Sequence, residues 1–321
     1  MRKLHHLVVC LLFLLPSCLF AQGSVTIYGI VTDPSGAVVA NARVTATSTE
    51  TDQSRESSSN SDGSYVIPNL NVGKYRIQAQ ASGFKTFVQE NIVVQVDENR
   101  RVPIQLQVGE STQQIMVTAD VAQVETRSGA LREVIDSARI VEMPLNGRNA
   151  LQLQYLVPGS GGVNAPGQAE NESVSINGGR PNMNNYLLDG ADNEDPFFNT
   201  PSVFPNPDAL EEFSMETNAY RADRGRNAGA LMNAVTKSGT NQFHGTLFEF
   251  LRNDKLNARN FFSTGVPPFK RNQYGGTLGG PILRDKCFSS FRTRARVNAA
   301  HPARKLPRFS PSCNGREIFP P

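Results

Sequence analysis

The residues with the clearest capacity for chemistry lie in one acidic segment, residues 189–195, which reads Asp-Gly-Ala-Asp-Asn-Glu-Asp. Carboxylate and amide oxygens are the ligands that calcium prefers in proteins. The spacing does not match an EF-hand loop, because the glycine comes second and no helix signals flank the segment. We favour a turn in which Asp and Asn side chains accept hydrogen bonds from nearby backbone, and we predict no metal site.

No set of residues resembles the machinery of a hydrolase. His244 is the only histidine between the N-terminal segment and the C-terminal stretch, and a Ser/His/Asp triad needs a histidine beside its nucleophile. The charged run at residues 221–226 is a candidate functional patch; the resemblance of the surrounding residues to a known domain implies instead a helix and loop that precede a strand. We therefore predict that the protein is not an enzyme and binds no cofactor.

The four cysteines all lie near the ends of the chain, as Cys10, Cys18, Cys287 and Cys313. The body between them can form neither a disulfide framework nor a cysteine metal site, which is compatible with an oxidising periplasm. The formal net charge is +3. The stretch from Cys287 onward holds seven Lys and Arg residues against one Glu, so the rest of the chain is mildly acidic. The basic balance is therefore no argument for nucleic-acid binding.

The N-terminal residues 1–22 have the pattern of a secretory signal peptide. A positively charged start precedes an apolar run over residues 7–15, Pro16 ends that run, and the small residue Ala21 offers a cleavage point. The run is too short to span a bilayer as a permanent helix. We predict export with cleavage near Ala21, and a loose lipobox at residues 15–18 leaves a lipid anchor as the alternative.

Residues 24–108 alternate polar and apolar side chains over short runs separated by turn residues, a pattern typical of a half-buried antiparallel sheet. The strongest hairpin signal is Asp62-Gly63, because glycine tolerates positive φ. About seven short strands in this length indicate a small β-sandwich. The runs that we expect to be strands are 25–31, 42–47, 64–67, 74–79, 91–96 and 101–108.

The order of motifs in this module resembles the carboxypeptidase regulatory-like domain. The matching segments are 29–39 (Gly-Ile-Val-Thr-Asp-Pro-Ser-Gly-Ala-Val-Val), 61–65, 68–70, 73–75 and 81–85. The resemblance implies a transthyretin-like sandwich without catalytic residues, related to starch-binding folds, so carbohydrate is a candidate ligand. The aromatic side chains at strand or turn positions are expected to pack in the core rather than form a sugar platform. They are Tyr28, Tyr65, Tyr75 and Phe84.

Residues 121–240 resemble the plug of TonB-dependent outer-membrane receptors. The matching motifs are 140–149 (Ile-Val-Glu-Met-Pro-Leu-Asn-Gly-Arg-Asn), 156–159, 175–180, 186–190, 207–213 and 229–239. The resemblance implies a mixed α+β plug that fills the lumen of a wide barrel. Such a domain faces water and polar barrel wall, so we expect a small core and many polar loops. The Asn- and Gly-rich loops of residues 160–199 suit the substrate side.

A polar break at residues 109–112 separates the two modules, and the segment after it resembles the TonB box. Such a box is an extended segment that adds as a strand to the sheet edge of the energy-transducing protein TonB through backbone hydrogen bonds. A further strand of the sandwich, or a plain linker, is the alternative interpretation. The predicted TonB-binding residues are Gln114, Ile115, Met116, Val117, Thr118 and Ala119.

Residues 241–286 resemble the first barrel strands of the same receptors. The remaining chain is too short to close a barrel, whose smallest form has about 8 strands, and open strands in lipid would expose unpaired backbone. After Lys286 the family would continue with a phenylalanine-rich strand and Tyr-Glu-Gly-Thr-Arg-Gln.

The residues from Cys287 onward differ from that expectation in a way that a frameshift explains. When the third base of each codon is read with the first two of the next, permitted codons spell Phe-Phe-Phe-Phe-Ser-Tyr-Glu-Gly-Thr-Arg-Gln. We therefore predict an out-of-frame tail over residues 287–321. A genuine Arg- and Pro-rich tail is the alternative.

The predicted fold class is mainly β, with an N-terminal transthyretin-like β-sandwich, then a mixed α+β plug domain, and only the first strands of a β-barrel. The expected boundaries are 1–22 for the signal peptide, 23–108 for the sandwich, 109–120 for the linker with the TonB box, 121–240 for the plug, 241–286 for the first barrel strands and 287–321 for the tail.

By this resemblance the chain is the N-terminal fragment of a TonB-dependent receptor for energy-coupled uptake of a large nutrient, such as a glycan, peptide or siderophore. The full-length receptor would lie in the cell outer membrane with TonB as its partner. The fragment would be exported to the periplasm and would not transport alone. The alternative function is a periplasmic or surface β-sandwich module that binds carbohydrate.

Overall fold

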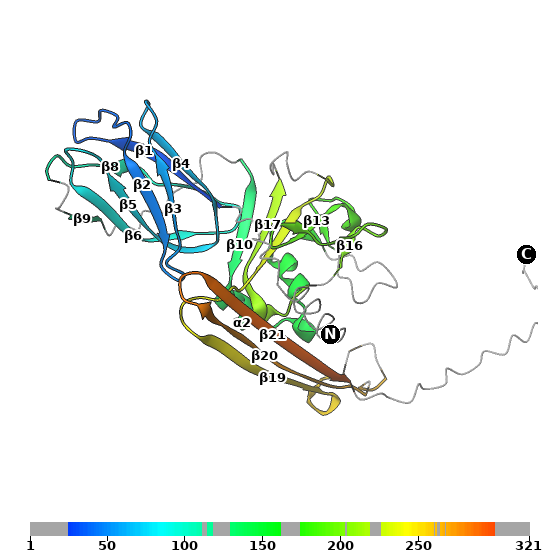
Figure 1. Ribbon diagram of the computed structural model, residues 1–321. Helices are drawn as coiled ribbons and strands as arrows, with labels where there is room; N and C mark the ends of the chain where they lie inside the picture. The colour runs from blue at the N-terminus through cyan, green and yellow to red at the C-terminus, as the bar shows by residue number, and fades with distance from the viewer. Residues whose placement is uncertain are drawn as a thin grey trace, which may run out of the picture. The chain divides into compact units, whose positions relative to one another are not determined.

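The computed structural model describes residues 25–110, 114–117, 129–161, 174–202, 204–218, 226–259, 261, 264–266 and 268–298. These residues form a mainly β structure that contains a sandwich, a second domain with short helices, and three long strands (Figure 1). The predicted fold class is therefore confirmed. The expected signal peptide lies outside the described residues. None of the helices among the described residues is long and apolar enough to cross a membrane.

The sandwich consists of two sheets, drawn from blue to cyan in Figure 1. In the first, β1 (Val25–Thr32) lies between β4 (Ser64–Leu70) and β7 (Asn99–Arg101), and β8 (Ile104–Gln105) also pairs with β1. The second has the order β3-β2-β5-β6-β9. Its strands are β3 (Ser54–Ser58), β2 (Arg43–Ser48), β5 (Gly73–Gln80), β6 (Thr86–Val94) and β9 (Gln114–Val117).

The sandwich core follows from the alternation that the sequence shows. Val44 and Ala46 on β2 and Ile77 and Ala79 on β5 are fully buried and face the first sheet, whereas the residues between them are more exposed. The hydroxyl of Tyr65 donates a 2.7 Å hydrogen bond to the Val102 carbonyl oxygen, so the ring lies in the core without an unsatisfied polar atom. The predicted core positions of Tyr65 and Tyr75 are confirmed, and Phe84 packs partly buried against the same cluster. Tyr28 is buried as expected but lies outside that cluster.

Three parts of the sandwich differ from the expected strands. In place of the expected strand 91–96, the strand β6 begins at Thr86 and ends at Val94. The strand β3 has the sequence Ser-Arg-Glu-Ser-Ser and is almost wholly exposed; it has no apolar alternation and the sequence analysis did not predict it. The expected strand 101–108 is divided into β7 and β8, with Pro103 between them. Proline has no N–H to donate, which interrupts a ladder at that position. The Asp62-Gly63 turn forms, with Gly63 at φ +73. The hairpin predicted there is wrong, because the turn connects β3 to β4 and these two strands belong to different sheets.

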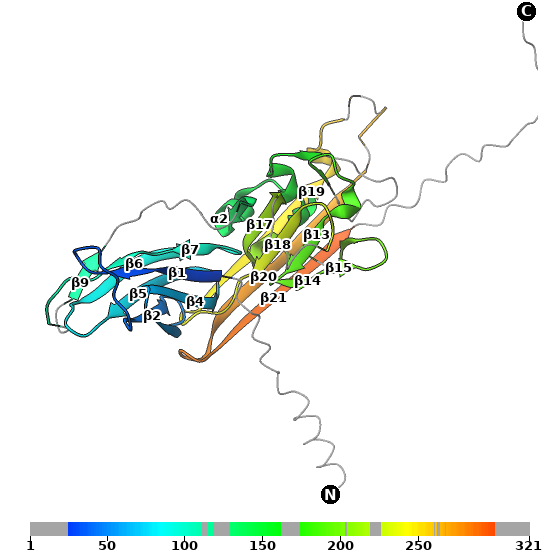
Figure 2. The same ribbon diagram turned by 90° about the horizontal axis from the view of Figure 1, so that it is seen from above.

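The second domain is built on a five-stranded sheet of order β10-β17-β18-β13-β14. Figure 2 shows β17, β18 and β13 side by side. The β13–β18 pair is parallel and the other pairs are antiparallel. The strands are β10 (Leu131–Asp136), β17 (Leu210–Asn218), β18 (Leu231–Thr236), β13 (Asn185–Leu188) and β14 (Ala191–Asp192).

Short helices cover this sheet and complete its core. The α-helix α2 begins after Asp136, whose carboxylate accepts a hydrogen bond from the Arg139 N–H and so caps the first turn. The apolar cluster centres on Ile140, Leu153, Tyr186 and Phe213. The helices are α2 (Ser137–Glu142) and the 3-10 helices η1 (Asn146–Arg148), η2 (Ala150–Leu156), η3 (Pro181–Met183) and η4 (Pro207–Ala209). This mixture of strands and helices matches the predicted α+β plug.

Two small hairpins and a final sheet account for the other strands. The hairpins pair β11 (Ser160–Gly161) with β12 (Ser175–Ile176), and β15 (Glu194–Asp195) with β16 (Thr200–Pro201). The final sheet has the order β19-β20-β21, with bounds β19 (His244–Asn253), β20 (Lys270–Leu283) and β21 (Cys287–Asn298), and the 3-10 helix η6 (Asp254–Leu256) follows β19. The strand β21 covers the first residues of the expected out-of-frame tail.

Candidate functional site

The predicted TonB-binding segment forms the last strand of the second sandwich sheet. Residues Gln114–Val117 are the strand β9, which runs parallel to β6 with Gln114 beside Thr86 and Val117 beside Gln89. Thr118 and Ala119 lie outside the described residues. The arrangement corresponds to the alternative that the sequence left open, a further strand of the sandwich. An edge strand is also the geometry that a strand-adding partner needs, so partner binding stays a prediction.

The chain that leads to β9 is fastened to the beginning of β6. The Lys85 N–H donates to the Gln107 carbonyl oxygen at 2.8 Å, and the Gly109 N–H donates to the Gly83 carbonyl oxygen at 3.1 Å. Phe84 and Val108 form an isolated antiparallel bridge between these two bonds. The segment therefore starts from a fixed position next to the strand with which it pairs.

One buried ion pair joins two of the plug motifs. The Arg148 guanidinium, from Leu-Asn-Gly-Arg, donates to the Asp208 carboxylate, from Pro-Asp-Ala, across 2.6 Å, and both side chains are only 7% exposed. Arg148 also donates to the Val141 carbonyl oxygen at the end of α2 at 3.4 Å. A buried charge pair is stable only with good geometry. This Arg148–Asp208 pair, with the bond to Val141, therefore fixes α2, η1 and η4 relative to one another, and we call it the clamp.

The carboxylates of the acidic segment each serve a partner in the protein. The two Asp189 oxygens accept from the Thr236 N–H at 2.7 Å and from the Thr236 hydroxyl at 3.0 Å. Asp189 itself has φ +53, at the turn after β13. This arrangement is the predicted turn, in which an Asp side chain satisfies backbone groups. Among the described residues no group of three or more His, Cys, Asp or Glu side chains could hold a metal ion.

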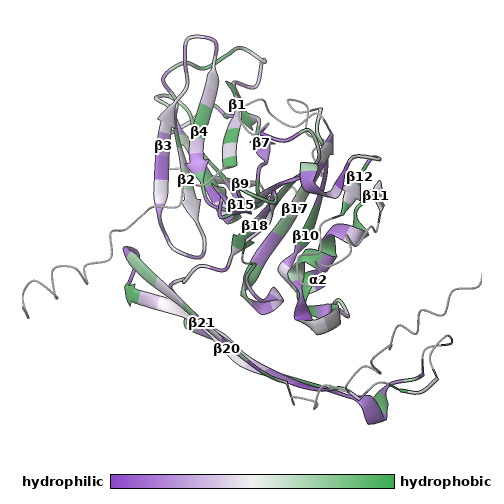
Figure 3. Ribbon diagram, turned by 90° about the vertical axis from the view of Figure 1, so that its right-hand side faces the viewer, coloured by the Kyte–Doolittle hydropathy of each residue, from purple (hydrophilic) through white to green (hydrophobic). Residues whose placement is uncertain are grey.

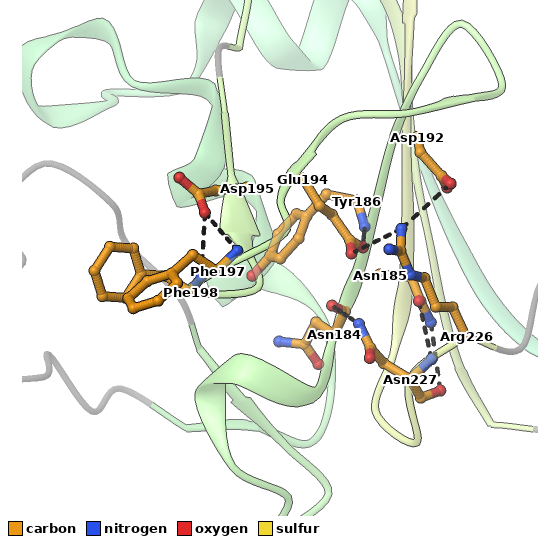
Figure 4. A network of polar contacts seen from close by, with 10 residues as sticks. All are labelled: Asn184, Asn185, Tyr186, Asp192, Glu194, Asp195, Phe197, Phe198, Arg226 and Asn227. Carbon is orange, nitrogen blue, oxygen red and sulfur yellow. Dashed lines mark hydrogen bonds and ion pairs between the residues drawn. The ribbon is translucent and has the colours of Figure 1, made fainter.

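The rest of the acidic segment fastens the β15–β16 hairpin to the sheet (Figure 4). The Glu194 carboxylate accepts from the Tyr186 N–H at 2.7 Å, and its side chain is only 2% exposed. Arg226 lies 3.4 Å from Asp192 and 4.0 Å from Glu194. Burial raises the pKa of Glu194, while the Tyr186 N–H and the Arg226 charge oppose the rise. Charge-assisted contacts thus hold the β15 strand of the hairpin to the sheet.

Asparagine side chains secure the chain that follows Arg226. Asn185 accepts from the Asn227 N–H at 3.1 Å, and the Asn227 amide donates to the Asn184 carbonyl oxygen at 3.1 Å (Figure 4). The fully buried Asn184 donates to the Val174 carbonyl oxygen and accepts from the Ala230 N–H. The backbones also approach closely here, since a Cβ at Gly229 would collide with the Met183 carbonyl oxygen. Of the charged run at 221–226, only Arg226 lies within the described residues.

The tip of the hairpin carries an exposed aromatic pair. Phe197 and Phe198 are 84% and 53% exposed, and their rings form an edge-to-face pair with centroids 4.7 Å apart. The Asp195 carboxylate accepts from both backbone N–H groups, at 2.7 and 3.2 Å. An apolar pair on a stiffened loop is a surface suited to a ligand or a partner. The sequence analysis did not single out these two residues, although it expected this stretch on the substrate side.

A second polar connection joins the plug sheet to the turn that follows β6. The Glu212 carboxylate on β17 accepts from the Val96 N–H at 2.7 Å, and Arg132 on β10 donates to the Val96 carbonyl oxygen at 3.1 Å. The Asn233 amide on β18 donates to the Asp97 carboxylate at 2.8 Å. Burial raises the pKa of Glu212 to about 7, opposed by the Val96 N–H and by Arg132.

This connection was missed by sequence reasoning. One signal was present: Glu212 stands on a strand whose other residues up to Met215 are largely buried, and a carboxylate there needs a dedicated partner. Its partner is a backbone N–H more than a hundred residues away in the chain, which no local pattern indicates.

Comparison with known proteins gives two family matches. Residues 26–107 match the carboxypeptidase regulatory-like domain, and residues 235–300 match an outer membrane beta barrel domain. The first match coincides with the sandwich, and the second with the final sheet from the end of β18 through β21.

One curated relative matches along most of the chain. The TonB-dependent transporter Oar of Myxococcus xanthus is 29% identical over 286 residues, which is 84% of this chain and 26% of the relative. The chain thus spans about a quarter of that relative's length. Among solved structures, the siderophore receptor PirA from Pseudomonas aeruginosa aligns with 52% of this chain and 27% of its own, at 20% identity and a TM-score of 0.36. A putative carbohydrate binding protein from Pseudomonas aeruginosa aligns with 28% of this chain and 92% of its own, at 16% identity and a TM-score of 0.20.

Proposed function

Because the resemblance to TonB-dependent outer-membrane receptors is confirmed, we propose that this chain supplies the periplasmic modules of a receptor for energy-coupled uptake across the outer membrane. The observation that carries the proposal is the 29% identity to a TonB-dependent transporter over 84% of the chain, which extends through sandwich, linker and plug. Transport belongs to the full-length receptor, since the three long strands described are fewer than the roughly 8 of the smallest closed barrels. In that receptor the modules lie at the outer membrane, and an isolated fragment would be periplasmic.

The partner that supplies energy is TonB, and its binding strand is the segment 114–119. An extended segment between two folded modules can pair with a sheet edge of another protein through its backbone. Side-chain identity then matters less than the ability of each residue to donate and accept backbone hydrogen bonds.

This partner assignment is tested by capture of the full chain on immobilised periplasmic TonB. Ile115→Pro removes one backbone donor and should abolish capture, whereas the matched control Ile115→Val keeps the backbone intact and should be captured like the parent. If both variants are captured equally well, the segment 114–119 does not bind TonB through its backbone.

The ligand side of the plug is the hairpin tip with Phe197 and Phe198. Exposed aromatic rings bind apolar or sugar faces, and the Asp195 hydrogen bonds keep the tip in one conformation. In the full-length receptor the double variant Phe197→Ala/Phe198→Ala should weaken ligand uptake, and Asp195→Asn serves as the milder control. Uptake unchanged in the double variant would place ligand contact elsewhere.

The carbohydrate-binding alternative gains no support from the sandwich. Its described aromatic side chains are buried or half-buried in or against the core, so none forms an open platform for a sugar ring. A glycan-array signal that the full chain retains after deletion of residues 113–119 would favour the alternative over the receptor.

A further inference from the structure

The two edges of the second sandwich sheet have opposite chemistry. At one edge β3 carries Arg55 and Glu56 and is almost wholly exposed, and Figure 3 shows it in the hydrophilic colour. Charged, polar edge strands resist pairing with further strands. At the other edge the first residues of β6 are Thr86, Phe87 and Val88, which are 3%, 6% and 7% exposed. The four residues of this edge that pair with β9, Thr86–Gln89, carry no charge to protect them and need a cover.

Val88 is buried although it lies on the outer face of the sheet. Phe87 lies opposite Ala79 and belongs to the sandwich core, whereas Val88 lies opposite Gln78 and is not part of that core cluster. Residues that pair across strands face the same side of a sheet. Val88 is nevertheless buried, and its neighbour in the parallel register is Met116 of β9.

The connection to β9 is short enough to favour this pairing strongly. Gly109 is bonded to Gly83, just before β6. Only four residues, 110–113, separate Gly109 from Gln114, the first residue of β9. A connection this short gives an effective concentration on the order of millimolar or above. The ladder itself covers only four residue pairs, and its stability therefore depends on this tether.

The far side of β9 remains available for another strand. Among the described residues the strand order of the sheet ends at β9, so one backbone edge of the segment faces β6 and the other is the end of the sheet. Ordering a free segment costs conformational entropy for each residue that is fixed. A segment already held in extended form presents its open edge without that cost.

We propose that β6 is a docking strip that holds residues 114–117 in extended form and presents their open edge to a partner strand. The partner is a protein with an exposed sheet edge, which under the proposed function is TonB. The presented strand is also attached to the plug, because β6 leads into the turn at Val96 and Asp97 that bonds to Glu212 and Asn233. The presentation of a strand to TonB rests on the proposed function, whereas the docking of the segment on β6 does not.

The test leaves the segment unchanged and alters only its docking. In one variant of the full chain, twelve Gly and Ser residues are inserted after Glu110, which lowers the effective concentration by roughly eightfold. In a second, Val88→Asp places a charge at a buried position of β6 that pairs in register with Met116, with Val88→Thr as the matched control of similar shape. Hydrogen exchange at residues 114–117 reports docking, and exchange at β1 reports whether the sandwich remains folded.

The parent and Val88→Thr should show slow exchange at 114–117, and the insertion and Val88→Asp faster exchange with β1 unchanged. Affinity for periplasmic TonB should fall at least fivefold in those two variants. Equal exchange in all four proteins would overturn the docking. If the insertion variant and Val88→Asp bind TonB more tightly than the parent, β6 hides the segment from TonB. If their affinity is unchanged, docking has no role in TonB binding. Either result overturns the proposal that β6 presents the segment to TonB. If the parent does not bind TonB while its segment is protected, the proposed partner fails and the docking stands.

Discussion

The sandwich and the plug are stabilised in different ways. The sandwich core consists of aliphatic and aromatic side chains from every second position of its strands. Their burial is favourable in proportion to the apolar area removed from water. The plug has a core of similar kind but adds buried polar clamps, among them Arg148–Asp208 and the Asn184 amide. Aliphatic packing tolerates substitutions of similar volume, whereas a buried polar clamp fails when one partner is removed. A single substitution at such a contact should therefore lower the stability of the plug more than a substitution in the core lowers that of the sandwich.

The largest effect is expected from breaking the ion pair of the plug. Asp208→Ala leaves the Arg148 guanidinium buried without its carboxylate, and loss of one partner of a buried pair costs about 3–5 kcal/mol. Hydrogen exchange followed peptide by peptide should show fast exchange over α2 and β17, with the sandwich strands β2 and β5 unchanged.

The double variant Arg148→Met/Asp208→Leu is the control for this clamp. It replaces the pair by apolar side chains and should recover most of the lost protection. Equal loosening of sandwich and plug in Asp208→Ala would contradict the contrast drawn between them.

The next effect concerns Glu212, whose pKa in the folded protein is about 7, against an ordinary value of 4.5. A carboxyl group with a raised pKa contributes stability that is fully present below about pH 4.5 and is lost as the pH rises through about 7. The shift corresponds to a loss on the order of 3 kcal/mol across this window. Thermal unfolding between pH 4.5 and 8 should therefore show a plug that becomes less stable as the pH rises.

Glu212→Gln keeps a side-chain oxygen for the Val96 N–H and removes the titrating group. Its pH profile should be flatter than that of the parent over the same window. Glu133→Gln, at a side chain on β10 that is 43% exposed, is the control and should leave the slope unchanged. If the unfolding temperature of the parent instead rises with pH over this window, Glu212 is ionised in the folded protein at little cost in stability.

A smaller effect is expected in the sandwich from Tyr65→Phe. The substitution keeps the ring in the core and removes the hydroxyl that donates to the Val102 carbonyl oxygen. A carbonyl group left without its partner costs about 1–2 kcal/mol. Urea denaturation monitored by exchange at β1 and β4 measures the loss. A loss as large as that in Asp208→Ala would mean that the sandwich also depends on single polar contacts.

The smallest effect is expected at the hairpin tip of the plug. Asp195→Ala removes two exposed hydrogen bonds to the Phe197 and Phe198 N–H groups, and exposed contacts of this kind contribute less than about 1 kcal/mol to global stability. Faster exchange should be confined to residues 196–199. Faster exchange over the whole plug sheet would show that the tip is part of the core rather than an appended loop.

Much of the architecture was predictable because it depends on local patterns. Period-two alternation located β1, β2, β4 and β5. Asp62-Gly63 located one turn, because few residues adopt positive φ without strain, but the turn joins strands of two sheets rather than a hairpin. The strand β3 escaped prediction because both of its faces are polar. The break at Pro103 was present in the sequence and was overlooked within a run that otherwise alternates.

The candidate sites were less predictable because their contacts join distant parts of the chain. The acidic segment at 189–195 was correctly expected to form a turn, but its role in holding the β15–β16 hairpin depends on Tyr186 and Arg226. The segment 114–119 was recognised from its motif and position. The sequence left open that this segment is a further strand of the sandwich, but nothing in its residues indicates that β6 is the strand with which it pairs.

The sequence by itself determined the module order, the sandwich core and the plug motifs, because alternation, turn residues and ordered motifs are properties of neighbouring residues. Only the tertiary structure decided that Arg148 meets Asp208, that Glu212 receives the Val96 N–H, and that β9 covers the unprotected edge of β6. The physical reason is the same in each case. Buried charges and open sheet edges must be satisfied by some partner, but the folding of the whole chain determines which partner is within reach.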